Sequence, residues 1–285
     1  MPAMTRRDPL IEIIYYTDPY CTWCWGSEPI LRHIQETFGD QVKITYKMGG
    51  LVENIETFYD QTNNISTFSQ VAPHWLEASS KHGMPVDADV FEKLKDEMRS
   101  TYPANIAYKA AELHDPELAK KYLRRLREAA STEQSPIHRE ETQIELANEV
   151  GLDIERFSAA LKSGRAKEAF EADLHEARSQ GISGFPTFII RNADDDQLLI
   201  HGYRPFSYFV RVFERLAPSP LVIHQPGDIP SFVKKYGHVA TQEVVEAFDL
   251  SRDNALATLV GLANEGQIKR VPLGNGDFWE PLSKN

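Results

Sequence analysis

The order of apolar and polar residues predicts a β–α–β unit at the start of the chain. The run at residues 10–16 is short, apolar and rich in β-branched side chains, which is typical of a strand buried on both faces. Apolar residues then recur at helical spacing from Ile30 to Phe38, and Gly39 suits the position that ends a helix. Residues 42–48 alternate like a second strand, which two glycines close.

From about residue 51 to residue 180 the pattern is almost wholly helical. Stretches rich in Ala, Glu, Lys and Leu alternate with Gly or Pro. Asp115 before Pro116 and Asp153 before Ile154 suit the caps of two helices. The helices are predicted at residues 67–81, 104–114, 116–130, 139–150, 154–161 and 166–179. We therefore expect a helical subdomain whose apolar side chains form a core.

A break at residues 181–186, which holds glycines and a proline, leads into two strands and a helix. Residues 187–190 and 198–201 are apolar segments on either side of a polar, acidic turn. The segment after Pro205 repeats apolar residues at helical spacing as far as Leu216. This hairpin and helix complete the unit that the first β–α–β began.

The last part of the chain is predicted as a linker followed by a winged helix. Four prolines between residues 218 and 230 make the linker semi-rigid. Thr241 and Ser251 suit helix caps, and Asn275-Gly276 is a hairpin turn signal. The helices are predicted at residues 231–236, 241–248 and 251–265, and the hairpin strands at residues 267–271 and 277–280.

The charge balance argues against nucleic acid and membranes as general partners. The 285-residue chain carries a net charge of −11, whereas binding to phosphates draws on clustered Lys and Arg. From residue 226 onward six basic residues accompany eight acidic ones, and the predicted helix 251–265 has only Arg252 as a cation. We therefore expect the winged helix to contact protein rather than DNA.

No stretch of the sequence has the character of a targeting or spanning segment. Asp8 and Glu12 interrupt the apolar run near the N-terminus, so no secretory signal forms. No later segment approaches about 18 unbroken apolar residues. The expected location is the cytosol.

The two cysteines of the chain, Cys21 and Cys24, lie between the first predicted strand and the first predicted helix. A helix N-terminus stabilises a thiolate through its unpaired N–H groups and its dipole. We expect Cys21 to be the exposed, low-pKa nucleophile and Cys24, one turn inside, to resolve the mixed disulfide. Thr22 and Trp23 bring no positive charge, and Asp18 would oppose the Cys21 thiolate.

A second candidate element is Phe185-Pro186, just before a predicted strand. A proline is tolerated at the first residue of a strand, and a cis bond there would place the Phe185 backbone against the dithiol. That backbone could pair with an extended peptide and so dock a substrate. The predicted substrate-binding residues are Phe185, Pro186, Thr22 and Trp23.

Two other interpretations of the cysteines are open. A zinc site would need about two further ligands, and the nine histidines include no pair at the usual spacing of three to five residues. The cysteines could also be incidental core residues. The sequence Met48-Gly49-Gly50-Leu51 lacks the spacing of a nucleotide-binding loop. We expect neither a metal nor a cofactor.

Asp-Pro-x-Cys-x-x-Cys-Trp-Gly and Gly-Phe-Pro-Thr give the chain a resemblance to the thioredoxin superfamily, over about residues 10 to 216. It resembles the DsbA-like branch, and its cytosolic FrnE-like members more than the periplasmic oxidases. The resemblance implies that Cys21 is the nucleophile, Cys24 the resolving cysteine and Pro186 the cis-proline. Thr22-Trp23 stands in place of the Pro-His of periplasmic DsbA.

The helical segment at residues 105–113 and the ending Gly-Asp-Phe-Trp at 276–279 also resemble the YjbH (SpxH) family. That resemblance covers nearly the whole chain. It implies a DsbA-like adaptor that presents the regulator Spx to the protease ClpXP.

Pattern and resemblance together predict an α/β fold in which a thioredoxin domain carries a helical insertion and a winged-helix-like C-terminus. The expected division is residues 8–50 and 181–217 for the split thioredoxin domain, 51–180 for the inserted helices, 218–228 for the linker and 229–285 for the winged helix. The leading hypothesis is a cytosolic thiol–disulfide oxidoreductase that acts on protein or small-molecule disulfides. The alternative is a protease adaptor or protein-binding module that retains its dithiol. An isomerase using Cys21 would differ only in substrate.

Overall fold

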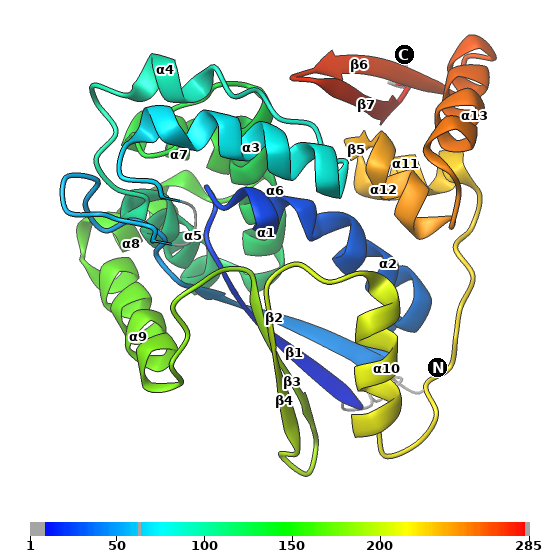
Figure 1. Ribbon diagram of the computed structural model, residues 1–285, viewed down its shortest axis with the longest axis horizontal. Helices are drawn as coiled ribbons and strands as arrows, with labels where there is room; N and C mark the ends of the chain where they lie inside the picture. The colour runs from blue at the N-terminus through cyan, green and yellow to red at the C-terminus, as the bar shows by residue number, and fades with distance from the viewer. Residues whose placement is uncertain (1–8, 62–63, 283–285) are drawn as a thin grey trace.

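A computed structural model describes residues 9–61 and 64–282 of the chain. Residue 8 of the expected thioredoxin domain, residues 62–63 of the expected helical insertion and residues 283–285 of the expected winged helix lie outside the described residues. Figure 1 shows a central sheet, a group of helices beside it and a smaller group of elements at the C-terminus.

The central sheet has four strands in the order β2-β1-β3-β4. β1 pairs in parallel with β2 and antiparallel with β3, which forms a hairpin with β4. The strands are β1 (Ile11–Thr17), β2 (Val42–Met48), β3 (Thr187–Asn192) and β4 (Gln197–His201). All four were predicted, and β1 and β3, in the middle of the sheet, are largely buried as expected of a strand covered on both faces.

Helices cover both faces of this sheet. Ile13 and Phe188 on one face share a core with α2 (Glu28–Phe38) and α10 (Phe206–Leu216). Ile189 on the opposite face packs with residues near the end of α9 (Arg165–Ser179). Successive residues of a strand point to opposite faces of the sheet, so the side chains of one strand pack against two different layers of helices.

The helix predicted after the cysteines is in fact two helices. The short α1 (Thr22–Gly26) ends at Ser27, and α2 begins with Glu28. Pro29 lies four residues after Trp25, so in one continuous helix its ring would clash with the Trp25 carbonyl and its missing N–H would leave that carbonyl unbonded. After α2 a short 3₁₀ turn, η1 (Gly39–Gln41), leads into β2.

Between β2 and β3 the chain forms the helical insert, defined here as α3 to α9. The predicted helices agree with the observed ones to within two residues at each end. Asp115 and Asp153 cap α6 and α8 with their side chains, as predicted. The helices before α9 are α3 (Phe68–His82), α4 (Val90–Leu94), α5 (Tyr102–His114), α6 (Pro116–Thr132), α7 (Glu140–Glu149) and α8 (Ile154–Lys162). Only α4 was not predicted, because five residues are too few to set a helical period.

The C-terminal module, defined here as α11 to β7, has the helix–strand–helix–helix–hairpin order of a winged-helix-like unit. Its sheet has the order β5-β7-β6. The elements are α11 (Ile229–Tyr236), β5 (Val239–Ala240), α12 (Thr241–Ala247), α13 (Arg252–Asn264), β6 (Ile268–Leu273) and β7 (Gly276–Pro281).

The short strand β5 was not predicted, and two further details of this module differ from the prediction. Thr241 does not cap α12 but is its first residue, and its hydroxyl accepts the Trp279 indole N–H at 2.9 Å. Glu243 instead accepts the Ala240 N–H at 2.7 Å and closes the start of the helix. The hairpin turn lies at residues 274–275, one residue earlier than the Asn-Gly signal indicated.

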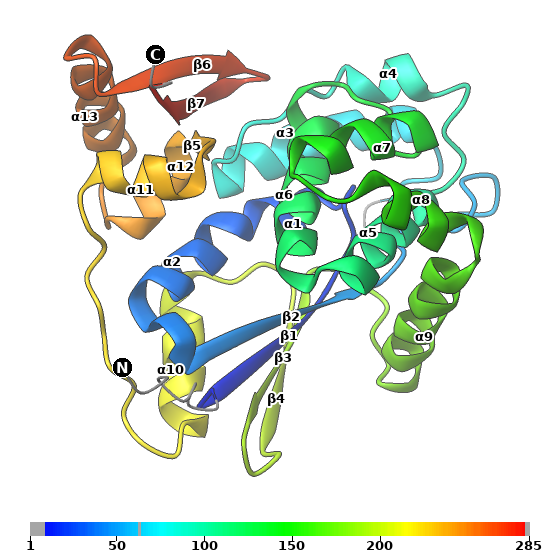
Figure 2. The same ribbon diagram turned by 180° about the vertical axis from the view of Figure 1, so that it is seen from behind.

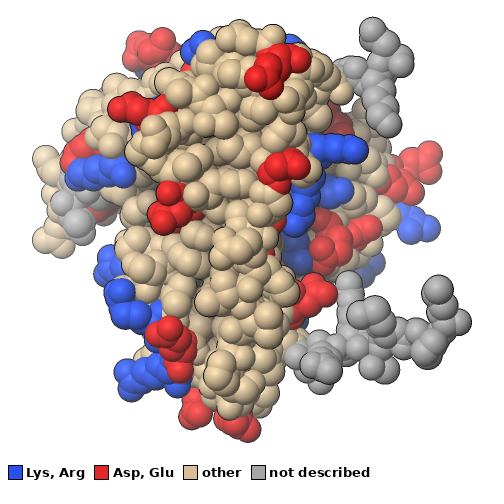
Figure 3. Space-filling view, turned by 90° about the vertical axis from the view of Figure 1, so that its right-hand side faces the viewer, with Lys and Arg blue, Asp and Glu red and all other residues tan. Residues whose placement is uncertain are grey.

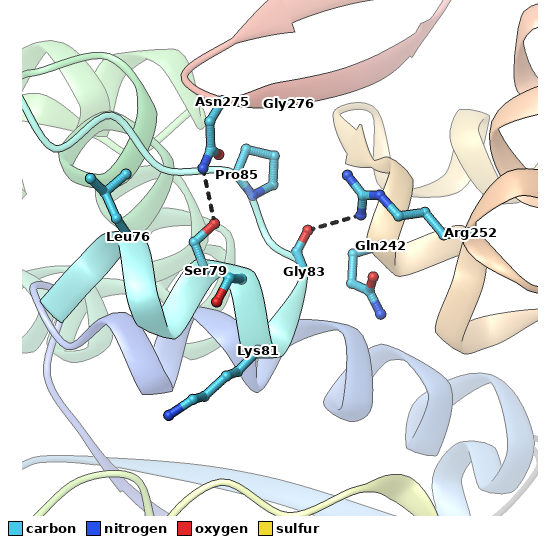
Figure 4. Close-up of a pocket in the computed structure, with 10 residues that line it drawn as sticks. Leu76, Ser79, Lys81, Gly83, Pro85, Gln242, Arg252, Asn275 and Gly276 are labelled. Atoms are coloured by element: carbon cyan, nitrogen blue, oxygen red, sulfur yellow. Dashed lines mark hydrogen bonds between the residues drawn. The ribbon is translucent and has the colours of Figure 1, made fainter. Parts of the chain in front are cut away.

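The shifted turn attaches the C-terminal module to the helical insert (Figure 4). The Asn275 N–H donates to the Val86 carbonyl at 3.0 Å, and the Val86 N–H donates to Asn275 Oδ1 at 2.8 Å. Gly274 has a φ of +57°, and a Cβ on it would lie 2.7 Å from the Val86 oxygen. A glycine in this position permits both the turn and the close approach. Arg252 donates to the Gly83 carbonyl at 3.4 Å on the other side of the seam.

The proline-rich linker runs as an extended segment from the end of α10 to α11, as Figures 1 and 2 show. The Gln41 amide bonds both the N–H and the carbonyl of Val222, each at 2.8 Å. The His224 N–H donates to the Thr37 carbonyl at 2.8 Å. The linker is thus fastened to the end of α2, and α12 then packs along α2 itself.

Candidate dithiol site

The two cysteines lie at the beginning of α1, shortly after the end of β1. Cys21 is the N-cap residue, and its Sγ accepts the Cys24 backbone N–H at 3.2 Å. Both thiols are free. Cys24 is fully buried, and Cys21 is only 5% exposed. The pair therefore has the spacing for an internal disulfide, but its sulfurs are both covered.

The loop before β3 brings Phe185 and Pro186 to the dithiol. The peptide bond between them is cis. The Phe185 carbonyl accepts the Cys21 thiol at 3.5 Å, although 164 positions separate the two residues. The Phe185 ring packs on Gly49, where a Cβ would lie 2.0 Å from the ring. The glycine pair after β2, predicted only to end a strand, also makes room for this loop.

Thr22 and Trp23, the residues between the cysteines, both lie near His82, the Trp23 ring at 5.8 Å, but they differ in exposure. Thr22 is buried, and its hydroxyl lies 3.4 Å from His82 Nε2 at the end of α3. Trp23 is partly exposed, and its ring lies 6.0 Å from that of Tyr203 and 6.2 Å from that of His74. Trp23 therefore belongs to the mouth of the site, and Thr22 faces the helical insert.

His82 is a member of the site that the sequence analysis did not identify. Its Nδ1 accepts the Met84 N–H at 3.1 Å, so the neutral ring carries its proton on Nε2, toward Thr22. Burial lowers the pKa of His82 to about 4. A Cβ on Gly26 would lie 2.4 Å from this ring, so the glycine of the Cys-Trp-Gly motif makes room for it.

A buried polar group beneath Cys24 was also missed. The Tyr15 hydroxyl donates to the Cys24 carbonyl at 3.4 Å. Arg127 of α6 is fully buried and bonds the Thr17 hydroxyl and the Glu28 carboxylate. One sequence signal pointed to Arg127: it follows Leu123 by four positions and so falls on the apolar stripe of its helix.

The structure contradicts the expectation that Cys21 is an exposed thiol of low pKa. Burial raises the pKa of Cys21 well above its ordinary value, and the nearby Cys24 and Asp18 add to the rise. The pKa of Cys24 is lowered: its burial acts in the opposite direction, but the hydrogen bond to Cys21, the charge of Arg127 and the Thr17 hydroxyl outweigh it. The short α1 offers Cys21 one N–H bond, which does not offset the loss of water.

Asp18 of the Asp-Pro motif holds the loop before the cysteines in place. Its fully buried carboxyl accepts four hydrogen bonds. The donors are the Tyr20 N–H at 2.8 Å and, each at 2.7 Å, the Leu51 N–H, the Thr101 hydroxyl and the Asn105 amide. Burial raises the pKa of Asp18. The motif therefore ties the dithiol loop to the insert as well as opposing the Cys21 thiolate.

The face of the molecule in Figure 3 carries charged side chains of both signs. On the face in Figure 3, Lys and Arg side chains are interspersed with Asp and Glu and do not gather into one patch. Within the described ranges 9–61 and 64–282, no helix combines the length and apolar character needed to cross a membrane.

Fold and site together define a thioredoxin-like protein, and comparison with known proteins agrees. A family model described as thioredoxin matches residues 15–211. A solved structure titled cytosolic disulfide reductase DsbM, from Pseudomonas aeruginosa, covers 72% of this chain and 98% of its own, with a TM-score of 0.57 and 24% identity. That likeness concerns the fold.

The sequence relatives define the family more narrowly. The ClpXP adapter protein SpxH of Halalkalibacterium halodurans is 31% identical over 279 residues, which is 97% of this chain and 90% of that protein. SpxH of Bacillus subtilis is 26% identical over 276 residues, 96% of this chain and 90% of that protein. The chain belongs to the SpxH family, within the thioredoxin-like class.

Proposed function

We propose that the chain is a thiol–disulfide oxidoreductase of the DsbA type that acts through Cys21 and Cys24. One observation carries this proposal: the Cys21 sulfur lies between the Cys24 N–H at 3.2 Å and the Phe185 carbonyl at 3.5 Å, next to the cis bond to Pro186. A dithiol beside such a backbone segment suits the attack on a disulfide held in an extended peptide.

The reaction transfers two electrons from the dithiol to the substrate. The Cys21 thiolate attacks one sulfur of the substrate disulfide, whose S–S bond breaks and releases the other sulfur as a thiolate. The Cys24 thiolate then attacks Cys21 Sγ, which forms the internal disulfide and releases the second substrate thiolate. The two protons lost by the cysteines balance those that the substrate thiolates take up through solvent. An external dithiol reductant regenerates the pair, and the reverse sequence oxidises a substrate dithiol.

Substrate binding must uncover Cys21 for this chemistry, because only 5% of the residue is exposed. A peptide that pairs with the backbone at Phe185 would compete for the carbonyl that now accepts the Cys21 thiol. Trp23 and Tyr203 at the mouth would contact its side chains. We place the activity in the cytoplasm, where the solved neighbour DsbM is described as acting.

The test is the reduction of insulin disulfides by an excess of dithiothreitol. The wild-type chain is expected to accelerate the reduction, and Cys21→Ser to return it to the uncatalysed rate, because the nucleophile is lost. His175→Asn, on an exposed face of α9, is expected to match the wild type. A wild-type chain no faster than dithiothreitol alone would sink the proposal.

A second candidate function is that of a ClpXP adaptor. The similarity to the SpxH relatives spans 97% of the chain, whereas the thioredoxin match ends at residue 211. The shared sequence therefore includes the C-terminal module, for which thiol chemistry gives no reason. An adaptor would present a regulatory protein to the protease and could do so with or without a working dithiol.

The adaptor function has its own measurement. With purified ClpXP and the Spx regulator, the wild-type chain is expected to accelerate degradation severalfold, and so is Cys21→Ser. Equal degradation with and without the chain would exclude the adaptor. A loss confined to Cys21→Ser would show that adaptor action needs the dithiol, and would join the two functions.

A further inference from the structure

A buried network of charges joins the C-terminal module to the rest of the protein. Glu243 of α12 is fully buried and lies 2.8 Å from Arg32 of α2. It also accepts two hydrogen bonds from Arg124 of α6, at 2.8 and 3.0 Å. Charges removed from water need close partners, and this carboxylate has two guanidinium groups.

The same network continues along α6 and the start of α2 toward the dithiol. Arg124 lies 3.8 Å from the Glu28 carboxylate, whose other oxygen bonds Arg127. Arg127 in turn bonds the Thr17 hydroxyl. Glu28 is therefore shared between two arginines: Arg124, which also pairs with the C-terminal module, and Arg127, which lies below Cys24.

Arg127 contacts two residues beside Cys24: it bonds the Thr17 hydroxyl, and it lies near the ring of Tyr15, whose hydroxyl donates to the Cys24 carbonyl at 3.4 Å. Arg127 brings a positive charge to this side of Cys24. The guanidinium carbon of Arg127 lies 5.6 Å from the centroid of the Tyr15 ring. Arg127 is therefore beside the residue that bonds the Cys24 carbonyl. Its Nε has no hydrogen-bond partner among the described residues. The single carboxylate Glu28 thus leaves part of its charge available to the sulfur.

We propose that Arg127 is a positioning residue that stabilises the Cys24 thiolate, and that Glu243 of the C-terminal module, acting through Arg124 and Glu28, sets how much of the Arg127 charge reaches that sulfur. This inference rests on the proposed oxidoreductase function. It gives the C-terminal module a part in the thiol chemistry, through a route of three ion pairs.

The sign of the effect follows from the sharing of Glu28. Removal of the charge of Glu243 leaves Arg124 with two carboxylates, Glu128 at 2.7 Å and Glu28 at 3.8 Å. Glu28 is then drawn more strongly toward Arg124 and away from Arg127. Arg127 then interacts more strongly with Cys24, in an interior where charges are weakly screened. Loss of the Arg127 charge acts in the opposite direction. Removal of the charge at Glu243 and removal of the charge at Arg127 should therefore shift the titration of Cys24 in opposite directions.

The test measures the pH midpoint of the ultraviolet absorbance of the Cys24 thiolate in a Cys21→Ser background, where Cys24 is the remaining thiol. This readout suits a fully buried sulfur, because no reagent has to reach it. Arg127→Met is expected to raise the midpoint by about one unit, a tenfold loss of thiolate at neutral pH, and Arg127→Lys to recover most of it. Glu243→Gln is expected to lower the midpoint by a few tenths of a unit. A glutamine at position 243 can keep the capping bond to Ala240.

Two further variants provide a second test of the network and a matched control. Glu28→Gln removes the shared anion directly and is expected to lower the midpoint more than Glu243→Gln, which keeps the inference testable if Arg127→Met does not fold. Glu246→Gln, on the same helix but facing His33 at 3.6 Å, is the matched control and should leave the midpoint unchanged. A loosened interior alone would shift all variants in the same direction.

Midpoints that do not move, or that move the same way in the Arg127 and Glu243 variants, would overturn the inference. The titration needs no turnover, so its outcome is separate from that of the proposed function. Normal insulin reduction with unmoved midpoints would refute the network alone. Opposite shifts in a chain without reductase activity would support the electrostatic network and refute the function on which it rests.

Discussion

Cys24→Ser is expected to leave the chain covalently joined to its disulfide substrate. Cys21 can still attack, but no second thiol lies within reach to release the mixed disulfide. Cys24 is held beside Cys21, with its N–H 3.2 Å from that sulfur, so it competes with external thiols as an intramolecular group of high effective concentration. We expect the mixed disulfide to last at least about 100 times longer than in the wild type at micromolar external thiol.

Non-reducing electrophoresis and intact-mass measurement after mixing with a disulfide-bonded peptide would detect the adduct. The double variant Cys21→Ser/Cys24→Ser supplies the matched control and should form none. If Cys24→Ser released the peptide as fast as the wild type, Cys24 would not be the resolving cysteine. If the single variant Cys21→Ser formed the lasting adduct instead, the assignment of the nucleophile would be reversed.

The sheet and most helices were predictable because their signals are local. Residues 42–48 alternate in sequence, and the strand has those bounds. Asp115 and Asp153 cap their helices because a short acceptor before a helix start bonds its own backbone N–H groups, whatever lies around it. The proximity of Phe185 and Cys21 followed from two motifs rather than from any single residue.

The rest of the site depends on contacts between distant parts of the chain. Cys21 was expected to be exposed because the sequence around it shows only that it begins a helix. The loop at Phe185 that covers it is distant in sequence, so the local pattern does not reveal it. Arg127 and His82 lie 103 and 58 positions after Cys24, and nothing in the sequence near them shows that they belong to the dithiol site. Pro29, by contrast, was visible in the sequence, and its clash with the Trp25 carbonyl could have predicted the break at Ser27.

Trp25 shows why the motif extends beyond the cysteines. Its indole N–H donates to the Pro85 carbonyl of the insert at 2.8 Å. The guanidinium carbon of Arg124 lies 4.4 Å from its ring centroid, and the Phe278 ring of the C-terminal module lies 6.4 Å away. This side chain of the dithiol helix thus contacts both the insert and the module. The residue next to the dithiol therefore helps to hold the three parts together.

Acid is expected to weaken the protein through His82, at the other side of the dithiol helix. Burial lowers the pKa of His82 to about 4 from its ordinary 6.5, so the unfolded chain binds a proton at a pH where the folded chain does not. The stabilising contribution is complete above about pH 6.5 and is lost as the pH falls toward 4. The free energy of unfolding should therefore fall by about 2.5 kcal/mol between pH 7.5 and 4.5 through this group.

Urea denaturation of wild type and His82→Asn at several pH values isolates this contribution from that of the other acid-titrating groups. Asparagine can keep an acceptor for the Met84 N–H, which Nδ1 now accepts at 3.1 Å, but it does not titrate. The stability difference between the two proteins should shrink by about 2.5 kcal/mol from pH 7.5 to 4.5, whereas His175→Asn, at an exposed position, should run parallel to the wild type. If the free energy of unfolding depended on pH in the same way in the wild type and in His82→Asn, protonation of the buried ring would cost no stability. In that case the packing of His82 on Gly26 and its contact with Thr22 would not hold the ring neutral, and the dithiol helix would tolerate a charge at its side.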